Sequence, residues 1–492
     1  MLPLQSQGKL YVVGIGPGKG DLLTIRAKKV LEEADVILGH RTYVQRIQSE
    51  LPGIFERSGR FKQIVESRMG KELERVKLAV DLARDKKVCL ISGGDPSIYG
   101  MASLVVEYIV RNGIEVDLEI VPGVTAECAA SPLLGCPISG DHCILSLSDL
   151  LTPWEVIERR LISALLGDFV IVIYNPSSRR REKNLKKAME LVLRFRGDVP
   201  VGCVRNAERE GTEVWITRPS KLLGDESKRV DMHTVLFISS YETVNVNGKL
   251  LTPRGYSNKY DVGTADSKDL KDKDSDLKDS SKEKLAEVAG AKTEESLRIA
   301  ESSAEVAKKL IRGFGDVVER FIAERCFVAT ADVSVLSLLE FNRAGEAVRA
   351  AKDCKTIVTD VEMVRAGVVS RAKGKKVISA IGLELEPKLD RQTDRELKTG
   401  KTLSSAGIRR CSEWVKDGLV AIGNSPSALE ELCTMIDEGI KPKAVVATPV
   451  GFTNATKAKE ELMQKDIPWI VVKGARGGST LCVAIVNALL AF

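Results

Sequence analysis

Lys9–Gly18 reads KLYVVGIGPG, an apolar run that ends in a glycine-proline-glycine turn. Similar runs of strand length recur through residues 8–256, and polar or glycine-rich residues follow each of them: VCLISGG, LEIVPG, FVIVIYNP, VPVGCVRN and HTVLFISS. Segments with helical spacing separate several of these runs, such as Ile25 to Ala34 and Leu78 to Ala83. Strands that alternate with helices predict an α/β fold with mostly parallel sheets.

The composition sets the class of protein. A chain of 492 residues, 43% hydrophobic and 29% charged, is ordinary for a globular protein of two to four domains. It has no run of about 18 apolar residues and no charged start before an apolar stretch, so we expect neither a membrane span nor a secretory signal. Its ten scattered cysteines indicate reduced thiols in the cytoplasm. A net charge of +6 is weak support for nucleic-acid binding, and it would equally suit binding of an anionic small molecule.

The chain divides into three parts by composition. Residues 257–285 are rich in Lys, Asp and Glu and poor in large apolar groups, which predicts a solvated linker. Leucines near heptad spacing in this stretch make a transient helix the alternative prediction. Residues 286–492 resume a globular α/β pattern, with strands at KTIVTDV, KVISAIG, GLVAIGN, AVVATPV and PWIVVKG, and helices at LRIAESSAEVAKKLI, AVRAAKD and SALEELCTMIDEGI. The predicted domains are therefore 8–256 and 286–492, joined by the linker.

The turn after the first strand, Gly14 to Gly20, does not match the common nucleotide-binding motifs. Lys19 stands where the third glycine of a dinucleotide fingerprint belongs, and Gly20 stands where a P-loop needs Ser or Thr. What remains is a tight turn, with Thr24 as the cap of the next helix. The turn either lets a ligand approach the backbone closely or is an ordinary connection.

Four further strand ends carry polar residues, in the strings SGGDPSIYG (92–100), VPGVTA (121–126), YNP (174–176) and VRNA (204–207). Open α/β sheets bind ligands at the carboxyl ends of their strands. Asp95 could accept a hydrogen bond from a ribose hydroxyl or a cationic group. Thr125 offers a hydroxyl at a helix start. These strings predict one ligand site.

Histidine is scarce. The chain holds only His40, His142 and His233, and residues 234–492 contain none. Chemistry that needs an imidazole must use one of these three, and we predict no metal site because no His/Cys cluster exists. We expect His142 and His233 to be structural.

The strings GIGPG, GGDP, PGVTA, YNP and VRNA, in this order, resemble the tetrapyrrole methyltransferases, S-adenosylmethionine enzymes with two α/β lobes and a cleft between them. SLSDLLTPWEVIERRL (146–161) and LLTPRGY (250–256) resemble the precorrin-3B C(17)-methyltransferases of cobalamin biosynthesis, which methylate ring carbon 17 and promote ring contraction. The resemblance covers residues 8–256. It implies a tetrapyrrole substrate with several carboxylates, S-adenosylmethionine as cofactor and a homodimer.

The resemblance assigns roles residue by residue. It implies cofactor contacts at Pro17, Gly93, Gly94, Asp95, Ile98, Thr125, Ala126, Asn175 and Ala207. The turn with Gly14, Gly16 and Gly18 matches the wall that faces the tetrapyrrole. His40 matches an acid/base position and either takes that role or only forms a hydrogen bond. Lys19 or Arg179–Arg181 could contact the carboxylates of the substrate; the alternative for the arginine run is a solvated helix start.

The second domain resembles the precorrin-8X methylmutases, which move a methyl group from ring carbon 11 to carbon 12 with the help of an acid. The resemblance rests on TIVTDVEMVRAGV (356–368), SSAGI (404–408), AIGNSPSAL (421–429), TPVGFTNATKAKEEL (448–462) and GARGGSTLCVAIVNALL (474–490), and it spans most of residues 295–492. From these strings, Ser425 or Ser427 is expected to cap a helix. The implied substrate contacts are Ser404, Ser405, Asn424, Gly451, Phe452, Arg476, Gly477, Gly478 and Ser479.

Two departures affect the predicted chemistry of this domain. Val328 stands where the family has its proton-donating histidine, and Leu403 stands where it has an arginine. Asp332 and Cys326 are the alternative acids. The domain is therefore either a second enzyme or a degenerate module that only binds or passes on a corrinoid; the two departures favour the module. A third alternative, a methyltransferase for another ring carbon, is disfavoured by SDLLTPWEVIERRL.

Overall fold

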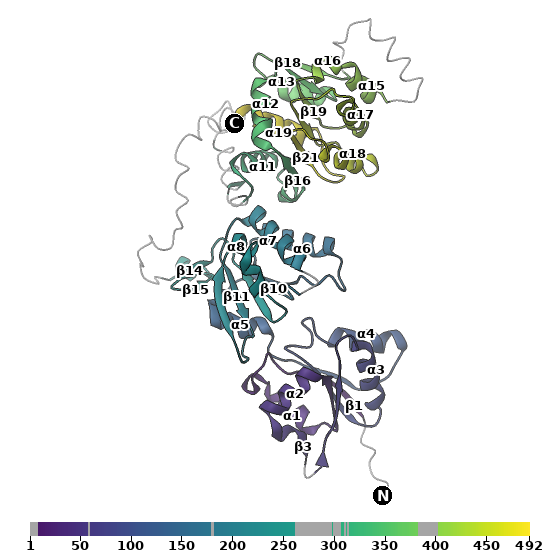
Figure 1. The fold of residues 1–492 in the computed structure, drawn as a ribbon, viewed down its shortest axis with the longest axis vertical. Coiled ribbons are helices and arrows are strands. Elements are labelled where there is room, and N and C mark those ends of the chain that lie inside the picture. The colour runs from purple at the N-terminus through teal and green to yellow at the C-terminus, as the bar shows by residue number, and fades with distance from the viewer. Residues whose placement is uncertain are drawn as a thin grey trace. The chain divides into compact units, whose positions relative to one another are not determined.

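The computed structural model describes residues 8–57, 60–178, 182–260, 298, 307–308, 311, 314–381 and 402–492. The chain forms two compact units, the first made of Met1–Leu191 with Asp198–Gly263 and the second of Val192–Gly197 with Thr264–Phe492 (Figure 1). Most of the predicted linker and the helix predicted at 297–311 lie outside the described residues. In the part of the chain that is described, no helix has both the length and the apolar character needed to cross a membrane.

The first unit begins with a parallel sheet of order β5-β2-β6-β1-β7. Its strands are β1 (Lys9–Gly14), β2 (Val36–His40), β5 (Gln63–Ser67), β6 (Lys87–Ser92) and β7 (Leu118–Val121). Helices α1 (Ile25–Glu33) and α2 (Arg41–Glu50) cover one face, and α3 (Glu72–Leu82) and α4 (Ala102–Asn112) cover the other. Because both faces are buried, the central strands β1, β2 and β6 are nearly continuous apolar runs. This sheet confirms the predicted α/β fold.

The second sheet of this unit, of order β12-β11-β13-β10-β9, is mostly antiparallel. Its strands are β9 (His142–Ser146), β10 (Val170–Tyr174), β11 (Val201–Arg205), β12 (Glu213–Thr217) and β13 (Thr234–Ile238). Only β9 and β10 run parallel, so the prediction of mostly parallel sheets is wrong here. The connection 206–212 is too short for the crossover that a parallel neighbour needs, and β13 inserts between β10 and β11.

Three helices accompany the second sheet: α5 (Ala126–Leu134), α6 (Trp154–Leu166) and α7 (Glu182–Arg196). Apolar residues of α5 pack with Val172, Val204 and Phe237 of the sheet. The remaining short elements are η1 (Gly20–Leu22), η2 (Pro52–Phe55), β3 (Glu56–Arg57), β4 (Arg60–Phe61), β8 (Gly135–Cys136), α8 (Pro219–Leu222), η3 (Asp225–Arg229), β14 (Val244–Val246), β15 (Lys249–Leu251) and η4 (Tyr256–Asn258).

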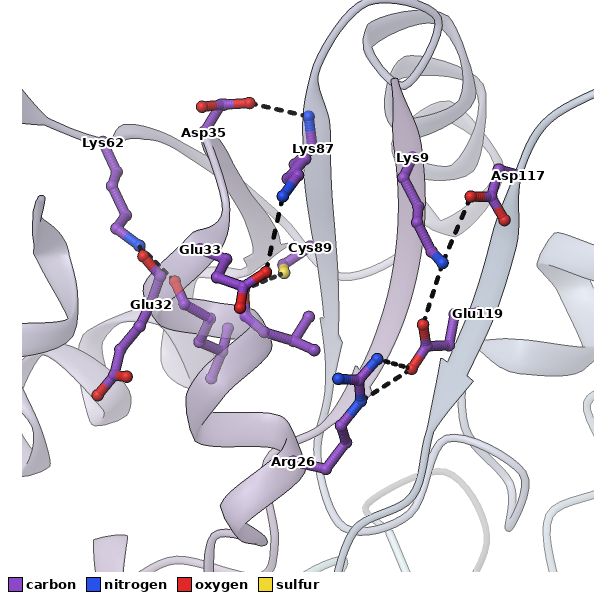
Figure 2. Close-up of polar contacts among 12 residues, drawn as sticks. Lys9, Arg26, Glu32, Glu33, Asp35, Lys62, Lys87, Cys89, Asp117 and Glu119 are labelled. Atoms are coloured by element: carbon purple, nitrogen blue, oxygen red, sulfur yellow. Dashed lines mark hydrogen bonds and ion pairs between the residues drawn. The ribbon is translucent and has the colours of Figure 1, made fainter. Parts of the chain in front are cut away.

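Ion pairs join strands and a helix of the first sheet at the end opposite to the carboxyl ends of its strands. Lys9, at the start of β1, lies 3.3 Å from Asp117 and 3.2 Å from Glu119 (Figure 2). Arg26 of α1 pairs with the same Glu119. Lys62 donates hydrogen bonds to backbone carbonyls at the end of α1. These charges have partners within the scaffold, so they belong to the fold and not to the site.

The described residues of the second unit form a sheet of order β16-β21-β20-β19-β17-β18. Its strands are β16 (Leu339–Asn342), β17 (Thr356–Thr359), β18 (Lys376–Ser379), β19 (Leu419–Ile422), β20 (Ala444–Ala447) and β21 (Trp469–Val472). All five predicted strands are present and parallel, and β16 adds an antiparallel edge that the sequence analysis missed. The helices are α11 (Val317–Thr330), α12 (Ala344–Asp353), α13 (Glu362–Val369), α15 (Leu403–Arg410), α16 (Ser412–Val415), α17 (Pro426–Asp437), α18 (Asn454–Met463) and α19 (Ser479–Ala491), with η5 (Val333–Leu338).

Two predicted caps are confirmed. The Thr24 hydroxyl accepts a hydrogen bond from the backbone N–H of Ala27, at 3.1 Å, and so begins α1. Of the two candidates for α17, Ser425 is the cap, and its hydroxyl accepts from Ala428 at 3.3 Å. Each cap satisfies an N–H that would otherwise lack a partner at the helix start.

Candidate functional site

Three glycine-rich loops merge at the carboxyl edge of the first sheet, after β1, β6 and β7. Gly16 and Gly94 exchange two backbone hydrogen bonds, of 3.2 and 2.8 Å. A Cβ added to Gly14 would lie 2.6 Å from the nitrogen of Gly123, and one added to Gly123 would lie 2.2 Å from the carbonyl oxygen of Gly94. Only glycine allows these backbones to approach so closely. The predicted wall and cofactor loops therefore form one continuous surface.

Asp95 ties two of these loops together. One carboxylate oxygen accepts from the N–H of Ser97 at 2.7 Å, and the other accepts from the N–H of Gly123 at 3.0 Å. The predicted contact of Asp95 with a cofactor would use lone pairs that these bonds leave free. Gly93 packs closely on the ring of Tyr43, and Ile98 continues the same loop toward α4.

The second sheet contributes a tyrosine-centred cluster at the ends of β9 and β10. The Tyr174 hydroxyl lies 2.5 Å from the Thr125 hydroxyl and accepts from the N–H of Glu127 at 2.9 Å. Burial raises the pKa of Tyr174 to about 12, so the phenol stays neutral. Asn175 has a left-handed φ of 50° and donates to Ser146 at 3.1 Å.

The other predicted residues of the first unit have local partners. Ala126 begins α5, and Ala207 is buried beside the left-handed Asn206. Lys19 pairs with Glu208 at 2.9 Å. Gly18 packs against that same stretch, because a Cβ there would lie 2.3 Å from the carbonyl oxygen of Glu208. Arg179–Arg181 lie outside the described residues.

His40 stands at the end of β2 and caps α2. Its Nδ1 accepts from the N–H of Thr42 at 3.3 Å, and its ring meets Tyr43 edge-on at 5.8 Å between centroids. Tyr43 in turn contacts Gly93, so His40 is one residue removed from the merged loops. His142 lies 3.9 Å from the buried carboxylate of Glu127, and the backbone of His233 donates to Asp231 at 2.9 Å.

In the second unit, a buried aspartate that the sequence analysis missed organises the site. The carboxylate of Asp360 accepts three backbone N–H groups, from Gly423 at 2.9 Å and from Asn424 and Ser425 at 2.7 Å each. It follows β17, and its partners follow β19, where the strand order reverses and α/β sheets bind ligands. Burial raises the pKa of Asp360, and the three donors oppose that rise. The signal was the carboxylate that ends TIVTD.

The loops after β20 and β21 come together at the same edge of the sheet as Asp360 and the loop after β19. Gly478 donates to the carbonyl of Thr448 at 2.7 Å, and Gly451 donates to that of Ala475 at 3.1 Å. Gly477, with φ of 158°, approaches Thr448 so closely that a Cβ would lie 2.1 Å from its oxygen. Phe452 is 97% exposed and Asn424 is exposed at the same edge, whereas Ser479 is nearly buried at the start of α19.

Two predicted contacts of this unit face protein partners. The Ser405 hydroxyl is buried and donates to Glu431 at 3.0 Å, which joins α15 to α17 and does not present the hydroxyl to a ligand. Ser404 is half-buried on the first turn of α15. Arg476 donates to the Ser334 hydroxyl at 2.6 Å and pairs with Asp332.

Lys459 holds the same loop from inside the protein. Its ammonium donates to the carbonyls of Gly474 and Arg476, at 2.7 Å each, and its side chain is fully buried. Because burial disfavours the charge, the pKa of Lys459 is lowered to about 8.

We expect Lys459 to make the stability of the second unit depend on pH. Its pKa is lower in the folded chain than the ordinary value of 10.5, so burying the charge costs stability below about pH 8. That cost disappears as the pH rises toward 10.5, because the unfolded chain then loses the same proton. The difference in Tm between wild type and Lys459→Met should therefore change in favour of wild type between pH 8 and 10. A difference that stays constant over this range would contradict the lowered pKa.

A cavity of about 360 Å³ lies between α11, α13 and α19. Its lining includes Val328, two arginines, Arg325 and Arg371, and the polar side chains of Ser479 and Asn487. The remaining lining residues are Ala329, Met363, Thr480, Val483 and Ala484. Within the described residues, the lining of this cavity thus offers cationic and neutral groups but no side chain that gives up a proton near neutral pH.

Neither alternative acid is placed to serve this cavity. Hydrogen bonds from Ser334 and Arg476 hold the pKa of Asp332 below its ordinary value, so it is ionised at neutral pH. Cys326 is fully buried, which raises the pKa of its thiol to about 12. A group that is already ionised and a thiol that holds its proton are both poor donors.

Merged glycine loops on the first unit and a cavity with two arginines on the second characterise a two-unit α/β protein. The family model of tetrapyrrole (corrin/porphyrin) methylases matches residues 9–222, and that of precorrin-8X methylmutase matches residues 293–492. The cobalamin biosynthesis protein CbiHC of Archaeoglobus fulgidus is 46% identical over 491 residues, which is 100% of this chain and 98% of that protein. The chain belongs to this family of cobalamin-biosynthesis fusion proteins.

Two further relatives match the first unit alone. A probable cobalt-factor III C(17)-methyltransferase of Methanocaldococcus jannaschii is 42% identical and matches 51% of this chain and 100% of its own length. A precorrin-3B C(17)-methyltransferase of a Sinorhizobium species is 37% identical and matches 51% of this chain and 98% of its own length. The resemblances read from the sequence are thereby confirmed, and the first unit is an S-adenosylmethionine-dependent methyltransferase.

Proposed function

We propose that the first unit methylates ring carbon 17 of precorrin-3B or its cobalt-containing counterpart, with ring contraction. The observation that carries this proposal is the surface on which Gly14, Gly94 and Gly123 bring three strand-end loops into backbone contact. The choice of ring carbon 17 comes from the names of the relatives. One relative is named for a cobalt-containing substrate and the other for precorrin-3B, so both forms of the substrate remain candidates.

The residues of this surface suit S-adenosylmethionine. The glycine loops bring backbone against backbone where any side chain would fill the space, and Thr125, Tyr174 and Asn175 add polar groups from a second direction. Bound S-adenosylmethionine supplies a methyl group on a sulfonium, which an electron-rich ring carbon can attack without a protein nucleophile. We assign alignment of the two reactants and exclusion of water to the loops, and acid/base help to His40.

The full chain tests this proposal directly. Incubated with S-adenosylmethionine and either ring, it should add one methyl group per ring, located at carbon 17 by NMR, with a shift in the absorbance of the macrocycle. Incubation without S-adenosylmethionine is the control. A methyl group on another ring carbon would favour the sibling methyltransferase, and an unmethylated ring would remove the assignment.

Asp95→Ala should weaken the binding of S-adenosylmethionine by about 1–3 kcal/mol, because it releases the N–H of Gly123 from its partner. Calorimetry on the full chain measures this. Asp95→Asn keeps one acceptor oxygen, so its affinity for S-adenosylmethionine should fall less than that of Asp95→Ala. Asp117→Ala, at the opposite end of the strands, is the matched control and should bind as wild type does. Unchanged affinity in Asp95→Ala would leave this residue with a turn-forming role only.

For the second unit, we propose binding of a corrinoid with little or no rearrangement of it. Val328 occupies the place of the proton donor in a cavity whose other described lining residues cannot replace it. The two arginines and the apolar side chains of that cavity suit part of a ring that carries carboxylates. Further contacts with the corrinoid at the strand ends would come from Gly451, Phe452, Asn424 and the Arg476–Ser479 loop. The alternative is a bifunctional enzyme.

We propose that residues 257–285 are an exposed linker between two domains, 8–256 and 286–492. Limited proteolysis should cut there first, because the stretch is highly charged and lacks large apolar groups to bury. Mass spectrometry of the fragments gives the cutting site. First cleavage inside either domain would contradict the boundary.

We also propose that the chain acts as a homodimer in the cytoplasm. The support is the resemblance to both families, together with ten cysteines that are all free thiols. Analytical ultracentrifugation should give twice the chain mass of 53.7 kDa. A single-chain mass at micromolar concentration would contradict the dimer.

A further inference from the structure

Two arginines from distant parts of the first unit converge on one backbone carbonyl. Arg46, on α2, points an Nη1 at the carbonyl oxygen of Pro17, at 3.5 Å. Arg209, in the connection between β11 and β12, donates from Nε to the same oxygen at 2.5 Å. That carbonyl belongs to the glycine-proline-glycine turn after β1, so the two cations meet beside the merged loops.

The neighbouring carboxylates are used elsewhere. Glu50, on the same helix as Arg46, accepts from the N–H of Gly20 at 3.2 Å. Glu208, next to Arg209, pairs with Lys19 at 2.9 Å. Within the part of the chain that the structure describes, neither arginine forms an ion pair. Besides the Pro17 carbonyl, Arg46 has the ring of Tyr43 at 5.9 Å, and Glu50 acts on its charge without pairing with it. A guanidinium has five N–H donors, and a single carbonyl accepts one from each.

Bringing these two cations together is unfavourable without an anion. Burial lowers the pKa of Arg46 and, together with the positive charge of Arg46, lowers that of Arg209 to about 10. Like charges that are partly removed from water repel more strongly than at an open surface. A carboxylate between them would offset this repulsion and use the free donors in the forked geometry that arginine favours.

We infer that Arg46 and Arg209 form a binding site for one carboxylate side chain of the tetrapyrrole, next to the Gly14–Gly18 turn. This inference rests on the proposed function, since that substrate supplies the carboxylates. The site joins α2, which covers the first sheet, to the β11–β12 connection of the second sheet through one ligand group, so it orients the ring with respect to the predicted cofactor loops. The sequence analysis named Lys19 as a possible contact for a carboxylate of the substrate. The charge of Lys19 is already paired with Glu208, so we assign this contact to Arg46 and Arg209 instead.

The test compares ring binding with cofactor binding in the full chain. Arg46→Gln and Arg209→Gln should each weaken the affinity for precorrin-3B or its cobalt counterpart by about 10- to 100-fold, measured by absorbance titration. The affinity for S-adenosylmethionine, measured by calorimetry, should stay within about twofold. The double variant should lose less than the product of the single losses, because both arginines bind one group. Arg→Lys at either position keeps the charge and should recover part of the affinity.

Arg111→Gln removes an equal charge from an exposed ion pair with Glu107 and is the control that should bind the ring as wild type does. Equal ring affinity in wild type and both Gln variants would overturn the inference. So would a parallel loss of ring and cofactor affinity, which would assign the arginines to holding the Pro17 turn. These outcomes are affinities, whereas the proposed function is judged by the methylated product, so either can fail without the other.

Discussion

Val328→His is expected to raise the rate at which the second unit rearranges precorrin-8 by about 10²–10⁴-fold, the range that general-acid help supplies. Wild type should convert the ring slowly or not at all. The reason is local: Val328 lines the cavity between α11, α13 and α19, where the other described side chains hold no proton to give near neutral pH. Absorbance of the rearranged product, followed in the full chain, measures the rate.

The design separates proton transfer from polarity. Val328→Gln introduces a hydrogen-bonding side chain that cannot transfer a proton, and it should stay as slow as wild type. The rate of Val328→His should fall as the pH rises past about 6.5, where an unperturbed imidazole loses its proton. Wild-type conversion as fast as that of a histidine-bearing relative would contradict the prediction. It would return attention to Asp332 and Cys326, despite the ionised carboxylate and the buried thiol found here.

Gly123→Ala is expected to lower the affinity of the chain for S-adenosylmethionine by at least about 100-fold. The new Cβ would lie 2.2 Å from the carbonyl oxygen of Gly94 and 2.9 Å from the backbone of Gly14. Both are backbone atoms that cannot rotate away, so the loops after β1, β6 and β7 must separate. The hydrogen bond from Gly123 to Asp95 would be strained as well. Calorimetry gives the affinity, and circular dichroism checks that the chain is folded.

Gly140→Ala is the matched control for this variant. Gly140 lies in a connection of the same unit, and a Cβ added there meets nothing within 4 Å. It should bind S-adenosylmethionine as wild type does and melt at the same temperature. Normal binding by Gly123→Ala would mean that the three loops do not act as one surface, and it would remove the observation on which the proposed methyltransferase site rests.

The strand-helix alternation of the chain could be predicted because it depends on local pattern. Apolar runs such as those of β6 and β19 are buried on both faces, and burial of that kind leaves a direct mark in the sequence. The caps Thr24 and Ser425 were also predictable, since a cap bonds to residues only three positions away. The antiparallel pairing of β13 was not, because pairing between strands depends on contacts distant in the chain.

The candidate site divides in the same way. Its motifs, the missing histidine at Val328 and the likeness to two families of cobalamin biosynthesis were determined by the sequence alone, because residue types at fixed spacing carry that information. Only the tertiary structure decided that Asp360 holds the Gly423–Ser425 loop, that Lys459 supports the Arg476 loop, and that Arg46 and Arg209 meet at Pro17. Arg46 and Arg209 are far apart in the chain, and neither belongs to a motif that names the other. Folding alone brings their charges together, and the repulsion that results is what points to an anion between them.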